Sequence, residues 1–110
     1  MADDSAERAD LVLTTDRDGG AAVVGVIGEL DAYSAPALEE LTGGLRADGC
    51  TDLTLDLSQT TFVDSSGLRI LLALHNDLAA GSGRLVLQNP SDPVARLLTI
   101  TGLSDHFQKA

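Results

Sequence analysis

The sequence predicts a single α/β domain built on a four-stranded mixed sheet. The strand order is 1-2-3-4, the first strand is antiparallel, and the helices lie mainly on one face. Short aliphatic runs typical of strands alternate along the chain with longer runs whose leucines recur at helical spacing. Crossovers between parallel strands are right-handed, so successive crossovers in one direction place their helices on the same face. The 110 residues, 44% hydrophobic and only 3% aromatic, suit one domain with an aliphatic core.

The first two strands are predicted to form a hairpin. Residues 11–15 are the first strand, and residues 21–27, nearly all apolar, are an internal second strand. An Asp-Gly-Gly turn at residues 18–20 joins them, because glycine supplies the positive φ angle that a tight turn needs. Residues 1–9 are polar and acidic and are expected to be a disordered tail, which leaves residues 10–110 for the domain.

The first helix is predicted to begin after Ser34 as its N-cap. Pro36 suits the first helical turn, where its missing N–H would be unpaired in any case. Asp48 and Gly49 are expected to end this helix. The third strand follows at residues 53–57, where leucines face one side and polar residues face the other.

The rest of the chain continues the alternation of strands and helices. A second helix is predicted over residues 66–80, a fourth strand over residues 84–88 and a turn over residues 89–93. A third helix then ends at Gly102. Leu103 and Phe107 are expected to fold the C-terminus back onto the core.

The charge of the chain limits its partners. The net charge of −10 argues against binding a nucleic acid backbone and against direct binding to an anionic membrane, whereas a basic protein partner is compatible with it.

No apolar run reaches membrane-spanning length, and the acidic start lacks the features of a signal peptide, so we expect a cytoplasmic protein. The single Cys50 cannot form an internal disulfide and is expected to be a small turn or core residue.

Small polar residues cluster where two neighbouring strands are predicted to end. Asp31 follows the second strand, and Asp64, Ser65 and Ser66 follow the third, directly before a helix. Parallel neighbours place both groups at the carboxyl edge of the sheet, where α/β folds hold their sites. Ser and Asp also cap helix N-termini. The cluster is therefore either a plain cap or a functional site, and three capping-type residues in a row favour the second interpretation.

The helix after this cluster has a wider apolar arc than contact with a sheet requires. Leu71 and Leu74 lie at the centre of the arc, and Leu68 and Leu72 lie at one border, near Ser65. The surplus leucines are either core beneath a long loop or a partner-docking patch beside the serine.

Several enzyme sites are excluded by what the chain lacks. It has no Gly-x-Ser-x-Gly elbow, no phosphate-binding Gly-x-x-x-x-Gly-Lys and no Cys/His cluster for zinc. His75 is more than two helical turns from Ser65, too far to take its proton. A receiver domain would carry a lysine after a late strand, where this chain has Asn89 and Pro90. The sequence therefore argues against an enzyme, and we expect no cofactor of its own.

Several segments, in this order, resemble the STAS domain of bacterial anti-anti-sigma factors, over about residues 10–108. The Asp-Ser-Ser-Gly-Leu junction is the most specific of them. The segments are Gly28-Glu29-Leu30-Asp31, the Leu-x-Leu-x-Leu strand, Phe62-Val63-Asp64-Ser65-Ser66-Gly67-Leu68, Asn89-Pro90 and Thr101-Gly102-Leu103.

The resemblance implies a protein that binds an anti-sigma factor which is also a serine kinase, and that so releases a sigma factor for transcription. The kinase uses ATP to phosphorylate the serine directly after the motif aspartate, here Ser65. The phosphorylated form no longer binds, and a serine phosphatase resets it. Asp31 then matches the acidic residue at the partner-facing edge, and Asp64, Ser66 and Gly67 match the flanks of the site.

With the two border leucines added, the expected partner-binding residues are Asp31, Asp64, Ser66, Gly67, Leu68 and Leu72. Arg69 is a mild departure from the family pattern, because a small residue is common there in some members. An alternative role is a STAS-like regulatory subunit of a membrane transporter assembly without a phosphorylation switch. The intact Asp-Ser-Ser-Gly motif favours the antagonist.

Overall fold

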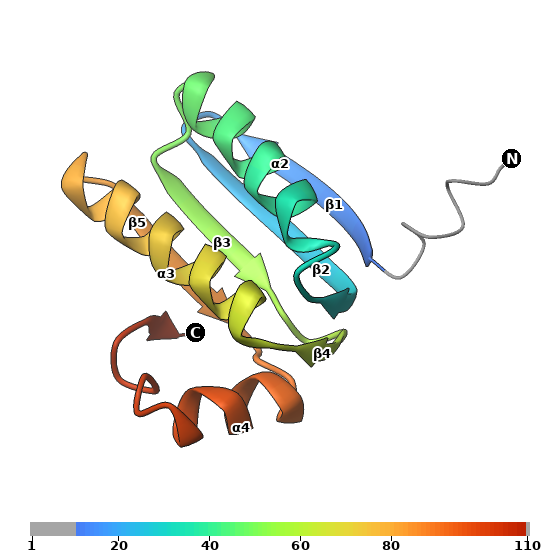
Figure 1. The fold of residues 1–110 in the computed structure, drawn as a ribbon. Helices are drawn as coiled ribbons and strands as arrows, with labels where there is room; N and C mark the ends of the chain where they lie inside the picture. The colour runs from blue at the N-terminus through green and yellow to red at the C-terminus, as the bar shows by residue number, and fades with distance from the viewer. Residues whose placement is uncertain (1–10, 110) are drawn as a thin grey trace, which may run out of the picture.

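A twisted mixed sheet with two helices side by side on one face forms the body of the protein (Figure 1). The structure is a computed structural model that describes residues 11–109, so the predicted tail, residues 1–9, lies outside the described residues. The strands are β1 (Leu11–Asp18), β2 (Ala21–Leu30), β3 (Asp52–Asp56), β4 (Thr60–Val63), β5 (Arg84–Gln88) and β6 (Gln108–Lys109). The helices are α2 (Ala35–Ala47), α3 (Ser65–Ala80) and α4 (Asp92–Ile100).

The predicted strand order is confirmed, and two short strands are added to it. The order is β1-β2-β3-β5-β6, with β1 antiparallel to β2 and the other neighbours parallel. The four predicted strands are β1, β2, β3 and β5. The prediction of four strands is wrong in number, because β6 joins the edge of β5 and β4 pairs with the last residues of β2.

The strand β2 has two different partners along one side. Residues 21–25 pair with β3, and residues 28–30 pair with β4, with an irregular register between Gly28 and Glu29. Gly28 has a φ of 110°, in the region that favours glycine, and its N–H donates to the Gln59 carbonyl at 3.0 Å. The bend at this glycine lets β2 continue past the end of β3 and pair with β4.

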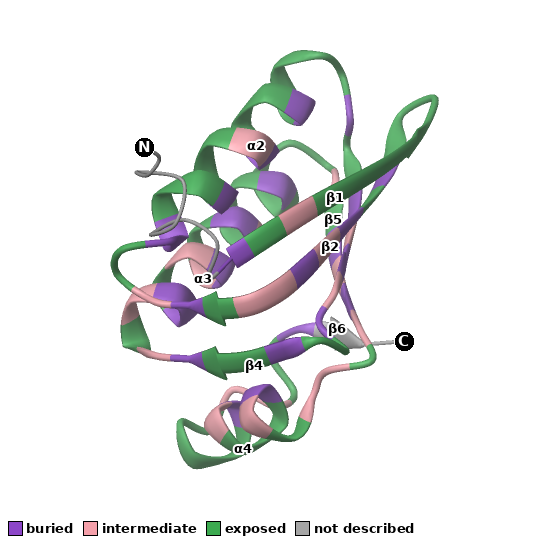
Figure 2. Ribbon diagram, turned by 90° about the vertical axis from the view of Figure 1, so that its right-hand side faces the viewer, coloured by how far each residue is buried: buried purple, intermediate pink, exposed green. Residues whose placement is uncertain are grey.

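The core lies between the sheet and the pair α2 and α3. As predicted, the leucines of the third strand are buried, with Leu53, Leu55 and Leu57 at most 1% exposed. Figure 2 shows the opposite face of the sheet uncovered and α4 lying beyond β4. Buried aliphatic side chains from both layers complete this core, among them Val24, Val26, Leu30, Leu38, Leu71, Leu74, Leu78, Leu85 and Leu87.

The C-terminus folds back as expected. Phe107 is 3% exposed, and its ring lies edge-on to both His75 and His106. The two histidine rings lie 4.8 Å apart between centroids. Cys50 is buried with a free thiol, as predicted for a core residue.

Candidate functional site

The pairing of β2 with β4 brings the two polar turns together. Leu30 and Val63 are register partners at the ends of these parallel strands. The Asp64 N–H then donates to the Leu30 carbonyl at 3.2 Å. Asp31 and Asp64, the residues that follow the paired ends, therefore begin two adjacent turns. The predicted convergence at one edge is correct, but β4 produces it, whereas the prediction attributed it to the end of β3.

The turn after β2 is organised around the Asp31 carboxylate. Its Oδ1 accepts from the backbone N–H groups of Tyr33 (3.0 Å) and Ser34 (2.9 Å). The Ser34 hydroxyl accepts from the Asp31 N–H at 3.0 Å and lies 2.6 Å from the Glu29 carbonyl, to which it can donate. These hydrogen bonds fix the conformation of the turn that leads into α2.

These contacts correct the expected role of Ser34. Ser34 stands at the N-cap position, but its side chain makes no cap hydrogen bond, because the hydroxyl is engaged with Asp31 and Glu29. The backbone of α2 begins instead with a hydrogen bond from the Ala35 N–H to the Asp31 carbonyl at 2.7 Å.

The same contacts act on the acidity of Asp31. The Ser34 backbone N–H lowers the pKa of Asp31 below its usual 3.8, with further lowering by the Ser34 hydroxyl and the Tyr33 N–H. Partial burial acts in the opposite direction but does not cancel the effect. Asp31 is therefore an anion at neutral pH.

The turn after β4 is a helix cap built by Asp64. Its Oδ1 accepts from the Ser66 N–H at 2.9 Å and the Gly67 N–H at 3.1 Å, the bonds an N-cap aspartate makes at a helix start. The carboxylate also lies at the positive end of the α3 dipole. From the sequence alone, Asp64, Ser65 and Ser66 were all possible caps of this helix. The structure shows that Asp64 is the residue that binds the free N–H groups.

Ser65 is the first residue of α3 and is exposed. Within the described residues its hydroxyl makes no hydrogen bond that would hold it to the protein. The neighbouring Ser66 is half-buried. Of the two serines, Ser65 therefore presents the more accessible oxygen, and the cap at this turn does not depend on it.

Gly67 and Leu68 lie inside the protein. A Cβ on Gly67 would lie 2.6 Å from the Leu30 carbonyl oxygen, so only glycine lets the first turn of α3 approach β2 this closely. Leu68 is 7% exposed. Both residues position Ser65 by packing, and their contact with a partner stays a prediction. Leu72 is half-buried and packs against the core.

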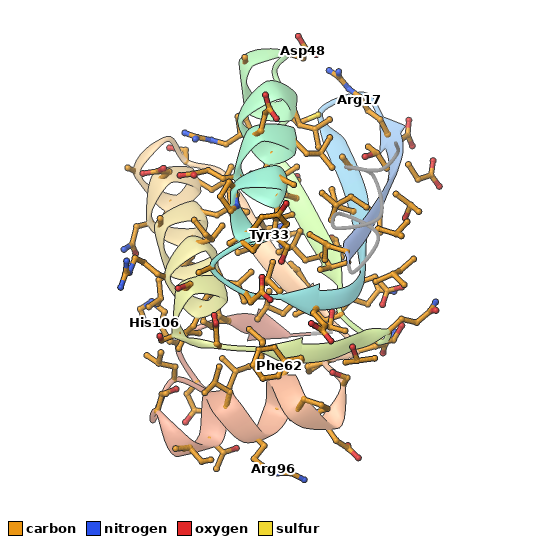
Figure 3. All side chains as sticks on the ribbon, turned by 45° about the vertical axis from the view of Figure 1, so that its right-hand side comes forward. Arg17, Tyr33, Asp48, Phe62, Arg96 and His106 are labelled. Carbon is orange, nitrogen blue, oxygen red and sulfur yellow. The ribbon has the colours of Figure 1, made fainter. Side chains whose placement is uncertain are left out.

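Two exposed aromatic residues adjoin the site and were not among the predicted site residues. The side chain of Tyr33, in the Asp31 turn, is 56% exposed, and that of Phe62, on β4, is 46% exposed (Figure 3). The chain has only one Tyr and two Phe residues. Aromatic side chains are enriched in protein interfaces, and this enrichment is the signal that could have identified both residues.

The described part of the chain holds neither a metal-binding cluster nor a membrane-spanning helix. No group of three or more His, Cys, Asp or Glu residues there could hold a metal ion. No helix among the same residues is long and apolar enough to cross a membrane.

Comparison with known proteins gives consistent matches. The STAS domain model matches residues 13–109. The anti-sigma-B factor antagonist of Staphylococcus aureus (strain NCTC 8325 / PS 47) is 38% identical over 82 residues, which cover 74% of this chain and 76% of that protein.

Solved structures agree with the sequence match. An anti-sigma factor antagonist from Mycobacterium paratuberculosis aligns with a TM-score of 0.74 and 35% identity, over 90% of this chain and 84% of that one. The anti-sigma factor antagonist SpoIIAA in its unphosphorylated form aligns with a TM-score of 0.78 and 25% identity, over 90% of this chain and 88% of that chain.

Proposed function

This chain belongs to the STAS domain family and is an anti-sigma factor antagonist of that family, and we propose that phosphorylation of Ser65 prevents it from binding its anti-sigma factor. In the proposed cycle the unphosphorylated chain binds an anti-sigma factor that is also a serine kinase, and a sigma factor is released. A serine phosphatase restores the binding form. The cycle is proposed to operate in the cytoplasm.

The accessibility of its hydroxyl supports Ser65 as the phosphate acceptor. It is an exposed hydroxyl, free of hydrogen bonds to the described residues, at the start of α3 and directly beside the cap carboxylate of Asp64. A kinase can reach this oxygen without breaking the cap. In the transfer, the γ-phosphoryl group leaves ATP and forms an ester with Ser65 Oγ, ADP is released, and the hydroxyl proton passes to a base on the kinase.

The charges of the site explain why the product would not bind. A phosphate adds about −1.5 to −2 charges. The Ser66 and Gly67 N–H groups that could neutralise it already bind Asp64, and Asp31 supplies a second anion from the adjacent turn. A partner surface that covers this edge would have to bury the new charge beside two carboxylates, which is costly without compensating cations.

In this cycle the partner kinase catalyses the phosphoryl transfer. The curated relatives are regulators by name, and this chain would supply the phosphate acceptor while the kinase supplies ATP and the chemistry. These relatives do not favour the alternative of a transporter subunit.

The test begins with a pull-down and mass spectrometry, with and without ATP, to identify the kinase. Mass-spectrometric mapping after incubation with that kinase and ATP should then place the phosphate on Ser65. Calorimetric titration should show that Ser65→Ala binds the kinase and keeps binding after ATP is added, whereas wild type and the control Ser66→Ala lose their binding once ATP is added. Ser65→Asp should bind at least about tenfold more weakly, a loss of about 1.4 kcal/mol.

Two results would contradict this function. One is a phosphate on Ser66 with Ser65 unmodified. The other is a Ser65→Asp variant that binds the kinase as tightly as wild type.

A further inference from the structure

A pocket of about 370 Å³ lies between the strand β1 and the first turn of α2. Four of the described residues that line it are apolar, namely Leu11, Leu13, Pro36 and Ala37. Leu11 is buried, whereas Pro36 and Ala37 are exposed, so the pocket has an apolar lining that opens to solvent. Its volume falls within the range of pockets that hold a small ligand or a single large side chain.

The other described lining residues are Tyr33, Ser34 and Glu40. Glu40 is exposed on α2, and Tyr33 is 56% exposed. Among the described residues, no Lys or Arg lines the pocket. Arg17 and Arg46 are paired elsewhere, with Asp48 and Asp77, each at 3.6 Å. Figure 3 shows Arg17 and Asp48 at the opposite end of α2 from Tyr33, so the charge of Glu40 is left unneutralised by these arginines.

The first turn of α2 offers nothing to an anion. Pro36 has no N–H. The Ala35 N–H donates to the Asp31 carbonyl, and the Ala37 N–H donates to the Ser34 carbonyl at 3.0 Å. The described lining therefore favours a ligand that combines apolar surface with a positive charge.

We propose that the pocket binds an arginine side chain presented by a partner protein. Its methylene stem packs on Leu13 and Pro36, as long cationic side chains do on apolar surface. The planar guanidinium stacks on the Tyr33 ring and pairs with the Glu40 carboxylate, a combination that a compact, strongly hydrated lysine ammonium matches less well.

The neighbouring strand suits the backbone of such a partner. β1 is the edge strand of the described sheet, since it pairs with β2 alone. An extended segment can add to an exposed edge while its side chains enter adjacent pockets. Ser65 does not line this pocket.

The test uses small probes at constant ionic strength, so it does not require the kinase. Amide shifts of the full chain are followed by NMR during titration with N-acetyl-arginine N-methylamide. The neutral analogue of similar shape, N-acetyl-citrulline N-methylamide, and the apolar N-acetyl-norleucine N-methylamide are the comparison ligands. We expect saturable shifts at Leu13, Tyr33 and Ala37 with the arginine probe, and weaker binding of both comparison ligands.

Two pairs of variants complete the experiment. Glu40→Gln should weaken the arginine probe about fivefold, the upper range for an exposed ion pair, whereas Glu39→Gln on the same helix should not. Ala37→Phe, which fills the pocket, should abolish the saturable shifts, and Ala79→Phe on α3 should leave them unchanged. Citrulline or norleucine probes that bind as tightly as arginine, or no saturable shift at this pocket, would overturn the proposal.

Discussion

Leu30 and Val63 pair across the parallel strands β2 and β4, and the two carboxylates of the site follow directly after them. The Asp64 N–H extends this pairing by donating to the Leu30 carbonyl. Backbone pairing therefore sets the positions of Asp31 and Asp64. A substitution in one carboxylate turn should leave the other turn in place, which allows the roles of these residues to be separated by mutation.

The cap of α3 should depend on Asp64 and not on Ser65. Asp64→Ala removes the acceptor of the Ser66 and Gly67 N–H groups and should lower the free energy of unfolding by about 0.5–2 kcal/mol. Ser65→Ala removes a hydroxyl without hydrogen bonds to the described residues and should change it by less than about 0.5 kcal/mol. Urea unfolding of both variants measures the difference, and equal losses would show that the serine contributes to the cap.

A side chain at Gly67 should destabilise the protein because it would clash with β2. Gly67→Ala would place a Cβ 2.6 Å from the Leu30 carbonyl oxygen, so α3 must shift and the protein should lose stability by about 1–3 kcal/mol. The matched control is Gly44→Ala on α2, where a new Cβ meets nothing within 4 Å. That variant should gain about 0.5–1 kcal/mol from helix propensity. Thermal unfolding of the two variants should therefore shift in opposite directions.

Asp31 should make stability depend on pH in the acid range. Its pKa in the folded protein lies below the usual 3.8, so the unfolded chain binds the proton more readily and stability rises with pH across this window. The contribution is complete above the unfolded value and is lost as the pH falls through the folded pKa. Asp31→Asn cannot ionise, so the free-energy difference between wild type and variant should be largest near neutral pH and should shrink in acid. A difference that stays constant from neutral pH into the acid range would contradict this assignment.

Alanine substitutions at two neighbouring leucines of α3 should differ in their effects on stability and on partner affinity. Leu71 is 1% exposed, and Leu71→Ala should cost about 2–5 kcal/mol of stability. Leu72 is half-buried, so Leu72→Ala should cost less stability and should lower the affinity for the kinase more than Leu71→Ala does. Calorimetric titration alongside urea unfolding compares the two effects. If both variants mainly unfold the protein, Leu72 belongs to the core alone.

Much of the fold could be predicted because its patterns are local. The alternation of residues 53–57 and the leucine spacing of α3 each identify an element without knowledge of its neighbours. β4 was missed because it is only four residues long, although Thr60–Val63 carries the β-branched and aromatic residues that indicate a strand. The strand can be recognised only once β2 is known to extend to Leu30, because residues 28–30 of β2 are its pairing partner.

The details of the site were harder to predict because they depend on distances between elements. Ser34, Asp64, Ser65 and Ser66 are all plausible caps by residue type. Only the positions of Asp31 and Glu29 show that the Ser34 hydroxyl faces back toward the strand. In the same way, the burial of Gly67 and Leu68 follows from the approach of α3 to β2, which a motif does not reveal.

The bend of β2 at Gly28 has a consequence for the folding of the chain. Beyond that bend β2 pairs with β4, and the buried Thr60 hydroxyl donates to the Val26 carbonyl across a sequence separation of 34 residues. Contacts this distant require closure of a long loop, so they form late relative to local helices and turns. We therefore expect the two carboxylate turns to come together after the local helices and turns have formed. A nascent or truncated chain would expose the Asp-Ser-Ser-Gly sequence without the assembled edge, and it should not compete with the finished protein for the kinase.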